Sequence, residues 1–318
     1  MSYAVRVSAY AKINLSLRVL GSRPDGYHEV RTIFQSIALH DTLTVRPRRG
    51  PFALQCDDPG CPADKTNLVW RAAGHVWAAS GRRGTMRDVE VRLSKRIPLQ
   101  AGLGGGSSDA AAALRLFGSI WRVKEPSLRE IAVTLGADVP YFLDGGTVLG
   151  IGRGDVLYRL VDHPAAWVTL VVPSFGVGTA DAYRWWDEIG GSKRPHPTAG
   201  RRTASGLPDP SNDLQGPVAA HHPEITQIVR ALRKAGAAHA AMSGSGSAVF
   251  GLFSRRPAAE RAARALSKSS RALSAAGAPG LRRVLVTGTI NRAAYQRLAG
   301  LPAHRINLPF APRSLGHS

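Results

Sequence analysis

A glycine-rich stretch between an alternating segment and an alanine-rich segment is the feature that most constrains this chain. Apolar and polar residues alternate over residues 89–94, which predicts a strand, and the alanines of residues 110–113 favour a helix. Between them, residues 102–106 include four glycines. Glycine removes the side chain where the backbone approaches another group closely, and it tolerates positive φ. The sequence therefore predicts a strand, a tight loop and a helix.

Two serines follow the glycines, and they stand where the N-cap of the helix is expected: Ser107 and Ser108. The free N–H groups and the dipole of a helix N-terminus favour an anion, so phosphate is the expected ligand. A flexible turn is the alternative. The stretch is not a Walker loop, which ends in Gly-Lys-Ser/Thr, and a dinucleotide fingerprint would need glycine in place of Ser107.

The loop resembles the signature Pro-x-x-x-Gly-Leu-Gly-Gly-Gly-Ser-Ser of the GHMP kinases, a superfamily of small-molecule kinases that includes galactokinase, homoserine kinase and mevalonate kinase. The resemblance implies that the matching residues bind ATP. These residues are Pro98, Leu99, Gln100, Ala101, Gly102, Leu103, Gly104, Gly105, Gly106, Ser107 and Ser108.

The length of 318 residues exceeds the usual size of one domain, so two domains sharing a cleft are expected. We expect a boundary close to Val156, giving domains over residues 1–156 and 157–300, a loop over residues 190–210, and a disordered tail over residues 301–318. No stretch reaches the ~18 apolar residues of a membrane span, and the first residues lack the apolar run of a signal peptide. These features predict a cytoplasmic protein that does not enter the membrane.

The chain is strongly basic, with 42 Lys and Arg against 22 Asp and Glu, a net charge of +20. Such a charge suits polyanions and makes nucleic acid a rival partner. The basic residues after Glu260 are scattered, however, without interleaved aromatic residues, so we expect no specific binding of nucleic acid.

The two cysteines, Cys56 and Cys61, are expected to be free thiols on a surface turn. A zinc site would need further ligands, for which His40 and His75 stay open.

Residues 5–19 alternate and predict a strand with Lys12, Asn14 and Ser16 on one face. Periodicity alone favours a solvated face for these three residues, although a lysine with polar neighbours can also clamp a phosphate. The segment resembles the first superfamily motif, Pro-Ala-Lys-Ile-Asn-Leu, with Tyr10 in place of proline. The resemblance implies that Lys12 is catalytic and that Asn14 contacts the substrate.

The pair Asp25-Gly26 predicts a tight turn that leads through Tyr27 and His28 into a new strand. A Tyr-His pair is most often a partly buried structural pair. Here the run Arg-Pro-Asp-Gly-Tyr-His-Glu resembles a segment typical of the 4-diphosphocytidyl-2-C-methyl-D-erythritol kinases. In that family the tyrosine and histidine hold the cytosine of the substrate, so the resemblance implies this role for Tyr27 and His28.

Residues 128–135 have helical spacing, and Gly136 ends the helix. Asp138 follows and could cap a short helix that begins at Pro140. The run Gly-Ala-Asp-Val-Pro-Tyr-Phe resembles the segment that supplies the catalytic aspartate of the same family. The resemblance implies that Asp138 removes the proton of the acceptor hydroxyl, while Lys12 keeps Asp138 ionised.

Two further residues enter as neighbours of ATP through the resemblance, Asn67 and Lys95. Capping of a helix that begins after residue 67 is the other role of Asn67.

The C-terminal half supplies the remaining expected substrate contacts. Residues 173–183 follow a predicted strand and lead into a predicted helix, with Thr179 and Tyr183 aligned on family positions; packing in the core is the alternative for Tyr183. Residues 240–253 predict a strand, a glycine turn and a strand, and resemble the third superfamily motif. The resemblance implies that Gly244 and Ser245 bind the substrate, and a tight hairpin turn is compatible with this role. Asn212, in the run Asn-Asp-Leu, opens a helix without an assigned chemistry.

The resemblance extends to about Ile290 and implies the α/β (α+β) fold of the GHMP kinases: a ribosomal-protein-like βαβ N-terminal domain and a ferredoxin-like C-terminal domain, with ATP and substrate between them. It implies ATP and Mg²⁺ as cofactors and phosphorylation of a cytidine diphosphate substrate, 4-diphosphocytidyl-2-C-methyl-D-erythritol, by a monomer or homodimer. There are two alternatives: another GHMP kinase of the homoserine or mevalonate type, and a basic nucleic-acid-binding protein.

Overall fold

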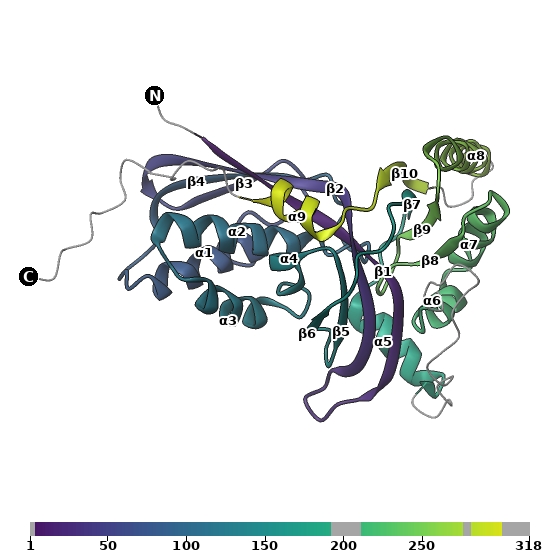
Figure 1. Cartoon of the computed structure of the whole chain (residues 1–318), viewed down its shortest axis with the longest axis horizontal. Helices are drawn as coiled ribbons and strands as arrows, with labels where there is room; N and C mark the ends of the chain where they lie inside the picture. Colours follow the sequence, from purple (N-terminus) through teal and green to yellow (C-terminus); the bar gives the residue numbers. More distant parts are fainter. Residues whose placement is uncertain (1–3, 192–210, 276–280, 301–318) are drawn as a thin grey trace, which may run out of the picture.

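A six-stranded sheet with helices on one face forms the N-terminal part of this computed structural model, which describes residues 4–191, 211–275 and 281–300 (Figure 1). The strand order is β3-β4-β2-β5-β6, and β1 pairs with β2. The strands are β1 Val5–Ser22, β2 His28–Pro51, β3 Ala53–Cys56, β4 Arg87–Ser94, β5 Thr147–Ile151 and β6 Val156–Arg159. The helices are α1 Leu68–Ala79, α2 Gly105–Trp121, α3 Glu125–Leu135 and α4 Tyr141–Asp144.

The second part of the molecule is a four-stranded antiparallel sheet in the order β10-β7-β9-β8. Its strands are β7 Trp167–Pro173, β8 His239–Met242, β9 Val249–Phe253 and β10 Leu281–Gly288. Its helices are α5 Thr179–Glu188, α6 Gln215–His221, α7 Glu224–Lys234 and α8 Arg256–Ala275. The strand and helix predicted around residues 173–183, the helix predicted after Asn212 and the two strands predicted within residues 240–253 are confirmed. The predicted loop over residues 190–210 falls largely outside the described residues, and the tail over residues 301–318 lies wholly outside them.

The β1–β2 hairpin connects the two sheets. The strands pair from Val5↔Val45 to Ser22↔His28, and the predicted turn is confirmed, with Gly26 at φ 80°. The far end of the hairpin runs past the first sheet to lie beside α5 (Figure 1). There the Arg18 guanidinium pairs with Asp213 at 2.8 Å.

The two units share a continuous apolar core. Alanines of α2 pack with α1, α3 and the first sheet, because a methyl group lets the helix approach the strands closely. Between the sheets, the inner face of β1 packs against β7 and β9, through Ile13, Leu15, Val168, Leu170 and Phe250. This contact fixes the sheets relative to each other.

The chain returns to the first unit at its end. Helix α9, Arg292–Ala299, places the buried Tyr295 against Tyr10. The Tyr295 hydroxyl donates to the carbonyl of Phe142 at 2.7 Å. Strand β6, which begins at the expected boundary residue Val156, pairs with β5 in the first sheet. The position of the domain boundary stays a prediction.

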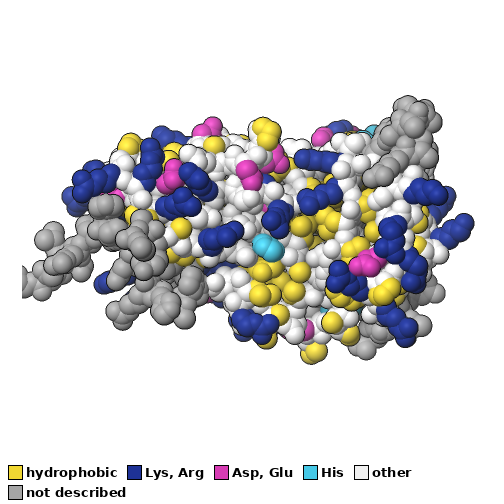
Figure 2. Space-filling model, turned by 90° about the horizontal axis from the view of Figure 1, so that it is seen from above, with side chains coloured by type: hydrophobic (Ala, Val, Ile, Leu, Met, Phe, Trp, Pro, Cys, Tyr) yellow, Lys and Arg dark blue, Asp and Glu magenta, His cyan; other side chains and the backbone are white. Residues whose placement is uncertain are grey.

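Basic side chains are dispersed rather than gathered on the face shown in Figure 2, where Lys and Arg lie among neutral and apolar groups. Within the described ranges, no helix is both long and apolar enough to cross a membrane.

Candidate active site

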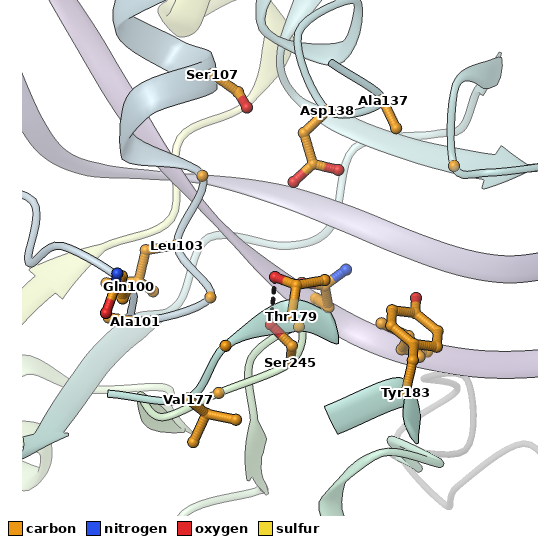
Figure 3. A pocket seen from close by; sticks show the side chains of 18 of the residues that line it. Gln100, Ala101, Leu103, Ser107, Ala137, Asp138, Val177, Thr179, Tyr183 and Ser245 are labelled. Carbon is orange, nitrogen blue, oxygen red and sulfur yellow. Dashed lines mark hydrogen bonds between the residues drawn. The ribbon is translucent and has the colours of Figure 1, made fainter. Parts of the chain in front are cut away.

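A cavity of about 1050 Å³ lies between the two units. It brings together most of the side chains that the sequence singled out (Figure 3). The predicted residues that line it are Lys12, Asn14, Tyr27, His28, Lys95, residues 98–107, Asp138, Thr179, Tyr183, Gly244 and Ser245. Two predicted residues do not line it: Ser108 and Asn67.

The N-terminus of α2 opens into this cavity. Gly104, at φ 70°, occupies the N-cap position, and a Cβ there would lie 2.6 Å from the Phe142 ring. The expectation that Ser107 or Ser108 caps the helix is therefore wrong, because the chain needs a left-handed, side-chain-free residue at the point of entry. The first intrahelical bond runs from the Ser108 N–H to the Gly104 carbonyl, which leaves the preceding N–H groups free for an anion.

The glycine loop contacts the predicted glycine turn of the second unit. Gly102, at φ 72°, lies so close to Ser243 that a Cβ would come within 2.1 Å of the Ser243 carbonyl oxygen. The Ser243 hydroxyl donates to the Gly102 carbonyl at 2.9 Å and accepts from the Asn14 N–H at 3.3 Å. Asn212 supports the same turn, because its amide donates to the carbonyls of Met242 and Gly244. Three segments distant in sequence thus meet at one edge of the cavity.

Lys12 and Asp138 form an ion pair in the middle of the cavity, with 3.4 Å between Nζ and Oδ2. The Lys12 ammonium also donates to Asn14 Oδ1 at 2.7 Å, and the Asn14 amide donates to the Thr32 hydroxyl at 2.7 Å. Lys12 and Asn14 are only 4% and 2% exposed, so the expected solvated face is wrong. This face of β1 is covered by Phe34 and the glycine loop of the first unit and by the turn at Ser243 and Gly244 of the second unit.

Asp138 lies in the turn between α3 and α4, and its side chain is 31% exposed. The capping role is wrong, because α4 begins after Pro140, and Asp138 accepts no capping bond among the described contacts. In Figure 3 the carboxylate of Asp138 faces the cavity, across from Thr179 and Tyr183.

Aromatic side chains form the other end of the cavity. His28 stacks on Tyr183, with 4.6 Å between ring centroids, and its Nε2 lies 3.0 Å from Asp187 Oδ1. Burial, together with the charge of Asp138, raises the pKa of Tyr183. Tyr27 is 54% exposed, and the Arg153 guanidinium lies 5.0 Å from its ring centroid. This end offers flat faces and hydrogen-bonding groups to a ring-shaped ligand.

Lys95 borders the cavity, but its ammonium is bound by two buried carboxylates, those of Asp41 and Asp109. Burial lowers the pKa of Lys95, and the charges of Asp109 and Asp41 outweigh this effect and raise it above its ordinary value. Burial, opposed by Lys95 and reinforced by Asp41, raises the pKa of Asp109 above its ordinary value. Asp41 also accepts the N–H groups of Arg96 and Ile97, which fixes the chain as it enters the glycine loop.

Asn67 caps α1, as its alternative role predicts, by accepting the Val69 N–H at 2.8 Å. Its amide group donates to the Pro62 carbonyl and to Cys61 Sγ. The following residue, Leu68, lines the cavity. A role of Asn67 beside ATP stays a prediction.

Cys56 and Cys61 are free and half-buried. Burial, with a hydrogen bond between the Cys61 thiol and Cys56, raises the pKa of Cys61 to about 12. In the part of the chain that the structure describes, no three His, Cys, Asp or Glu side chains are grouped as a metal site would require.

The fold and the site together define a small-molecule kinase of the GHMP type. The model for the GHMP kinases N terminal domain matches residues 67–146, and the model for GHMP kinases C terminal matches residues 201–272. The chain belongs to the 4-diphosphocytidyl-2-C-methyl-D-erythritol kinase family within these kinases. The expected fold class is thereby confirmed.

Three relatives support this membership. The kinase of this name from Pelotomaculum thermopropionicum is 41% identical over 292 residues, which cover 89% of this chain and 97% of the relative. The one from Solibacter usitatus is 45% identical over 277 residues, covering 82% and 85%. A crystal structure of 4-(cytidine 5'-diphospho)-2C-methyl-D-erythritol kinase superposes with a TM-score of 0.72 at 35% identity, covering 89% of this chain and 98% of that one.

Several residues that shape the cavity escaped the sequence analysis, among them Thr32, Arg153, Asp187 and Ser243. The spacing of Tyr183 and Asp187 was a usable signal, because residues four apart lie on one face of a helix. The others come together only through tertiary contacts.

Proposed function

We propose that this chain transfers the γ-phosphoryl group of ATP to the 2-hydroxyl of 4-diphosphocytidyl-2-C-methyl-D-erythritol, a step of the methylerythritol phosphate route to isoprenoid precursors. The names of the relatives support this substrate. The observation that carries the proposal is the ion pair of Lys12 and Asp138, which lies between the glycine loop and the aromatic end of one cavity.

The glycine loop is the proposed site of the ATP phosphates. Side chains at Gly102, Gly104 and Gly105 would each meet an atom at 3.0 Å or less, so the loop keeps a bare backbone toward the cavity. Free N–H groups at the start of α2 are donors for phosphate oxygens, and the helix dipole adds to the attraction. The predicted binding of ATP by residues 98–108 rests on this arrangement.

Asp138 is the proposed general base. Its carboxylate accepts the proton of the 2-hydroxyl as that oxygen bonds to the γ-phosphorus, and the bond from the γ-phosphorus to the bridging oxygen of ADP breaks. Lys12 holds a positive charge beside both the carboxylate and the transferred group, and Asn14 fixes the direction of the ammonium. A positioned general base contributes about 10² to 10⁴ in rate.

Mg²⁺ is the proposed metal cofactor. Mg²⁺ takes oxygen ligands and commonly uses one or two protein groups together with substrate phosphates. The cavity offers two such groups, the hydroxyl of Ser107 beside the glycine loop and the carboxylate of Asp138. When bound, the metal would neutralise part of the phosphate charge.

The aromatic end is the proposed site of the cytidine group. Tyr27 and Tyr183 present ring faces for stacking, and His28 presents a ring nitrogen for the edge of the base. Thr179, Gly244 and Ser245 border the space between this end and Lys12, where the methylerythritol diphosphate would lie. The Thr179 and Ser245 hydroxyls are 3.2 Å apart and form one polar strip.

The test is a coupled assay of ADP release with ATP, Mg²⁺ and the cytidine substrate, with mevalonate, homoserine and galactose in parallel. Turnover is expected with the cytidine substrate alone. Asp138→Asn and Lys12→Met are each expected to lose at least about 100-fold in kcat with an unchanged melting temperature. Turnover of another alcohol instead, or near-normal turnover in Asp138→Asn, would contradict the proposal.

The remaining expectations concern partners: a monomer or homodimer, in the cytoplasm, with no specific nucleic acid ligand. A titration with RNA at increasing salt tests the last of these, because binding by charge alone weakens steeply with salt.

A further inference from the structure

A carboxylate that the proposed mechanism does not use, that of Asp187, binds the histidine of the aromatic end. Asp187 Oδ1 and Oδ2 lie 3.0 and 3.1 Å from His28 Nε2. The two residues come from different units, because His28 opens β2 and Asp187 lies in the last turn of α5. Both line the cavity.

The His28 ring is held on three sides by α5. It stacks on Tyr183 with an interplanar angle of 23° and meets the edge of Trp186 at 88°, while Asp187 holds one nitrogen. These three positions share one side of the helix, because they are spaced by three and four residues. The His28 side chain is 11% exposed, against 44% for that of Asp187. The ring therefore has one orientation.

The contact also decides which ring nitrogen carries the proton. An ionised carboxylate only accepts hydrogen bonds, so Nε2 of His28 must be the donor to Asp187. In a neutral imidazole the other nitrogen, Nδ1, is then an acceptor. Among the described residues, the His28 ring has no hydrogen bond except that to Asp187. Nδ1 is thus an acceptor without a hydrogen-bond partner among the described residues, on a side chain that lines the cavity.

We propose that Asp187 is a positioning residue that makes the cavity select cytosine over uracil by fixing the tautomer of His28. This inference rests on the proposed function, since it assigns the base to the end formed by Tyr27, His28 and Tyr183. A base that shares the Tyr183 ring face with His28 lies nearly in the plane of the imidazole, so the Nδ1 lone pair meets the edge of that base. Cytosine presents an amino donor at C4, whereas uracil presents a carbonyl acceptor there.

The size of the effect follows from this reversal of polarity. With cytosine the acceptor is paired, and with uracil two acceptors face each other. Leaving such a group unpaired costs a factor of about 10 to 100 in the preference between the two bases. Hydrogen bonding that is built to one partner discriminates more strongly than shape, because cytosine and uracil have nearly the same outline.

The experiment compares kcat/KM for the cytidine substrate and for its uridine counterpart at pH 8, where imidazoles are largely neutral. The wild-type enzyme is expected to prefer cytidine by about 10- to 100-fold. Asp187→Asn keeps the size of the side chain, but its amide can either accept from or donate to Nε2, so both tautomers become available. The preference is expected to fall at least about 5-fold in this variant, with the KM for ATP within twofold of wild type.

Two variants serve as controls. Glu188→Gln removes one negative charge from the next residue of α5, whose carboxylate pairs with Arg184 at 2.9 Å and does not line the cavity. It is expected to keep the wild-type preference. Asp187→Glu keeps an acceptor on a longer side chain and is expected to retain more of the preference than Asp187→Asn.

Equal use of both substrates by the wild-type enzyme would overturn the inference, as would an unchanged preference in Asp187→Asn. If the wild-type enzyme phosphorylates neither substrate, the proposed function fails, and calorimetric titration of the free protein with CDP and UDP then decides the inference separately. A preference for CDP that Asp187→Asn loses and Glu188→Gln keeps would support it. Equal affinity of the wild-type protein for CDP and UDP would overturn it.

Discussion

Replacing Gly102 by alanine tests the contact between the glycine loop and the second unit. Gly102 has φ 72°, and an added Cβ would lie 2.1 Å from the Ser243 carbonyl oxygen and 3.1 Å from the Gly246 nitrogen. Both groups are backbone atoms of a buried turn, so neither can rotate away. The clash is relieved only if the glycine loop and the turn separate by about 1 Å, because carbon and oxygen atoms pack no closer than roughly 3 Å.

The cost follows from two local effects. A left-handed alanine costs about 1–2 kcal/mol relative to glycine. Separation also breaks the bond from the Ser243 hydroxyl to the Gly102 carbonyl, now 2.9 Å long, which contributes about 1 kcal/mol. Without any further packing loss, Gly102→Ala is expected to lower the free energy of unfolding by about 2–3 kcal/mol, equivalent to a fall in melting temperature of roughly 4–10 °C.

The same displacement is expected to lower kcat/KM about 100-fold, because errors near 1 Å in the placement of reacting groups have effects of this size. Ser243 accepts the Asn14 N–H, and Asn14 holds the Lys12 ammonium, so the disturbance reaches the ion pair with Asp138. The assays are thermal unfolding followed by circular dichroism and ADP release.

Gly106→Ala is the matched control for stability. Gly106 lies in the first turn of α2, where a Cβ would meet its nearest neighbour, Leu68 Cδ1, at an ordinary 3.7 Å. This variant is expected to melt at or slightly above the wild-type temperature, because alanine favours a helix over glycine by up to about 1 kcal/mol. If Gly102→Ala melts within about 1 °C of wild type and turns over normally, the close contact between the units is refuted.

Three further predictions concern residues outside the reacting groups. Burial, with smaller effects of His163 and Arg233, lowers the pKa of His239 to about 4, so the folded state binds fewer protons than the unfolded state between pH 4 and 6.5. The free energy of unfolding is therefore highest above this window and is expected to fall by about 3 kcal/mol as the pH drops through it. Urea unfolding across pH is expected to show a smaller fall in His239→Leu. Asp41→Asn leaves the buried Lys95 ammonium with a weaker partner, so it is expected to lower the free energy of unfolding by about 3 kcal/mol and to raise the KM for ATP. An unchanged KM would contradict the role of Asp41 in positioning the loop. Tyr295→Phe removes the hydroxyl that donates to the Phe142 carbonyl and also interacts with Arg115, and it is expected to lose about 1 kcal/mol with unchanged kcat. A change in kcat would show that α9 affects the site.

Elements with strong local signals could be predicted from the sequence. Strand β4 and helix α2 follow from the alternation and the alanine run on either side of the glycine loop, and the hairpin turn follows from the Asp25-Gly26 pair. Helix α9 was not predicted. Its eight residues are too few for a stable isolated helix, and it forms because Tyr295 docks into a pocket of the first unit.

The side chains of the site were predictable mainly through resemblance. Periodicity placed Lys12 and Asn14 on one face of a strand but favoured solvent on that face, since nothing local shows that the glycine loop and the turn of the second unit cover it. The cluster of Lys95, Asp41 and Asp109 gave no signal at all, because its members come from three elements and satisfy one another only after folding. Asp109 looks in sequence like any acidic residue at the start of a helix.

The contacts that hold the two units together are the same contacts that position the site. The Ser243 hydroxyl of the second unit bonds to the backbone of both Asn14 in β1 and Gly102 in the glycine loop. Asn14 in turn orients the Lys12 ammonium. The loop therefore reaches its observed geometry only when both sheets are packed against β1. It follows that variants at Asn14, Gly102 or Ser243 should lose stability and turnover together. Variants at Asp138 or Asp187, which are partly exposed, should change chemistry or base preference at nearly constant stability.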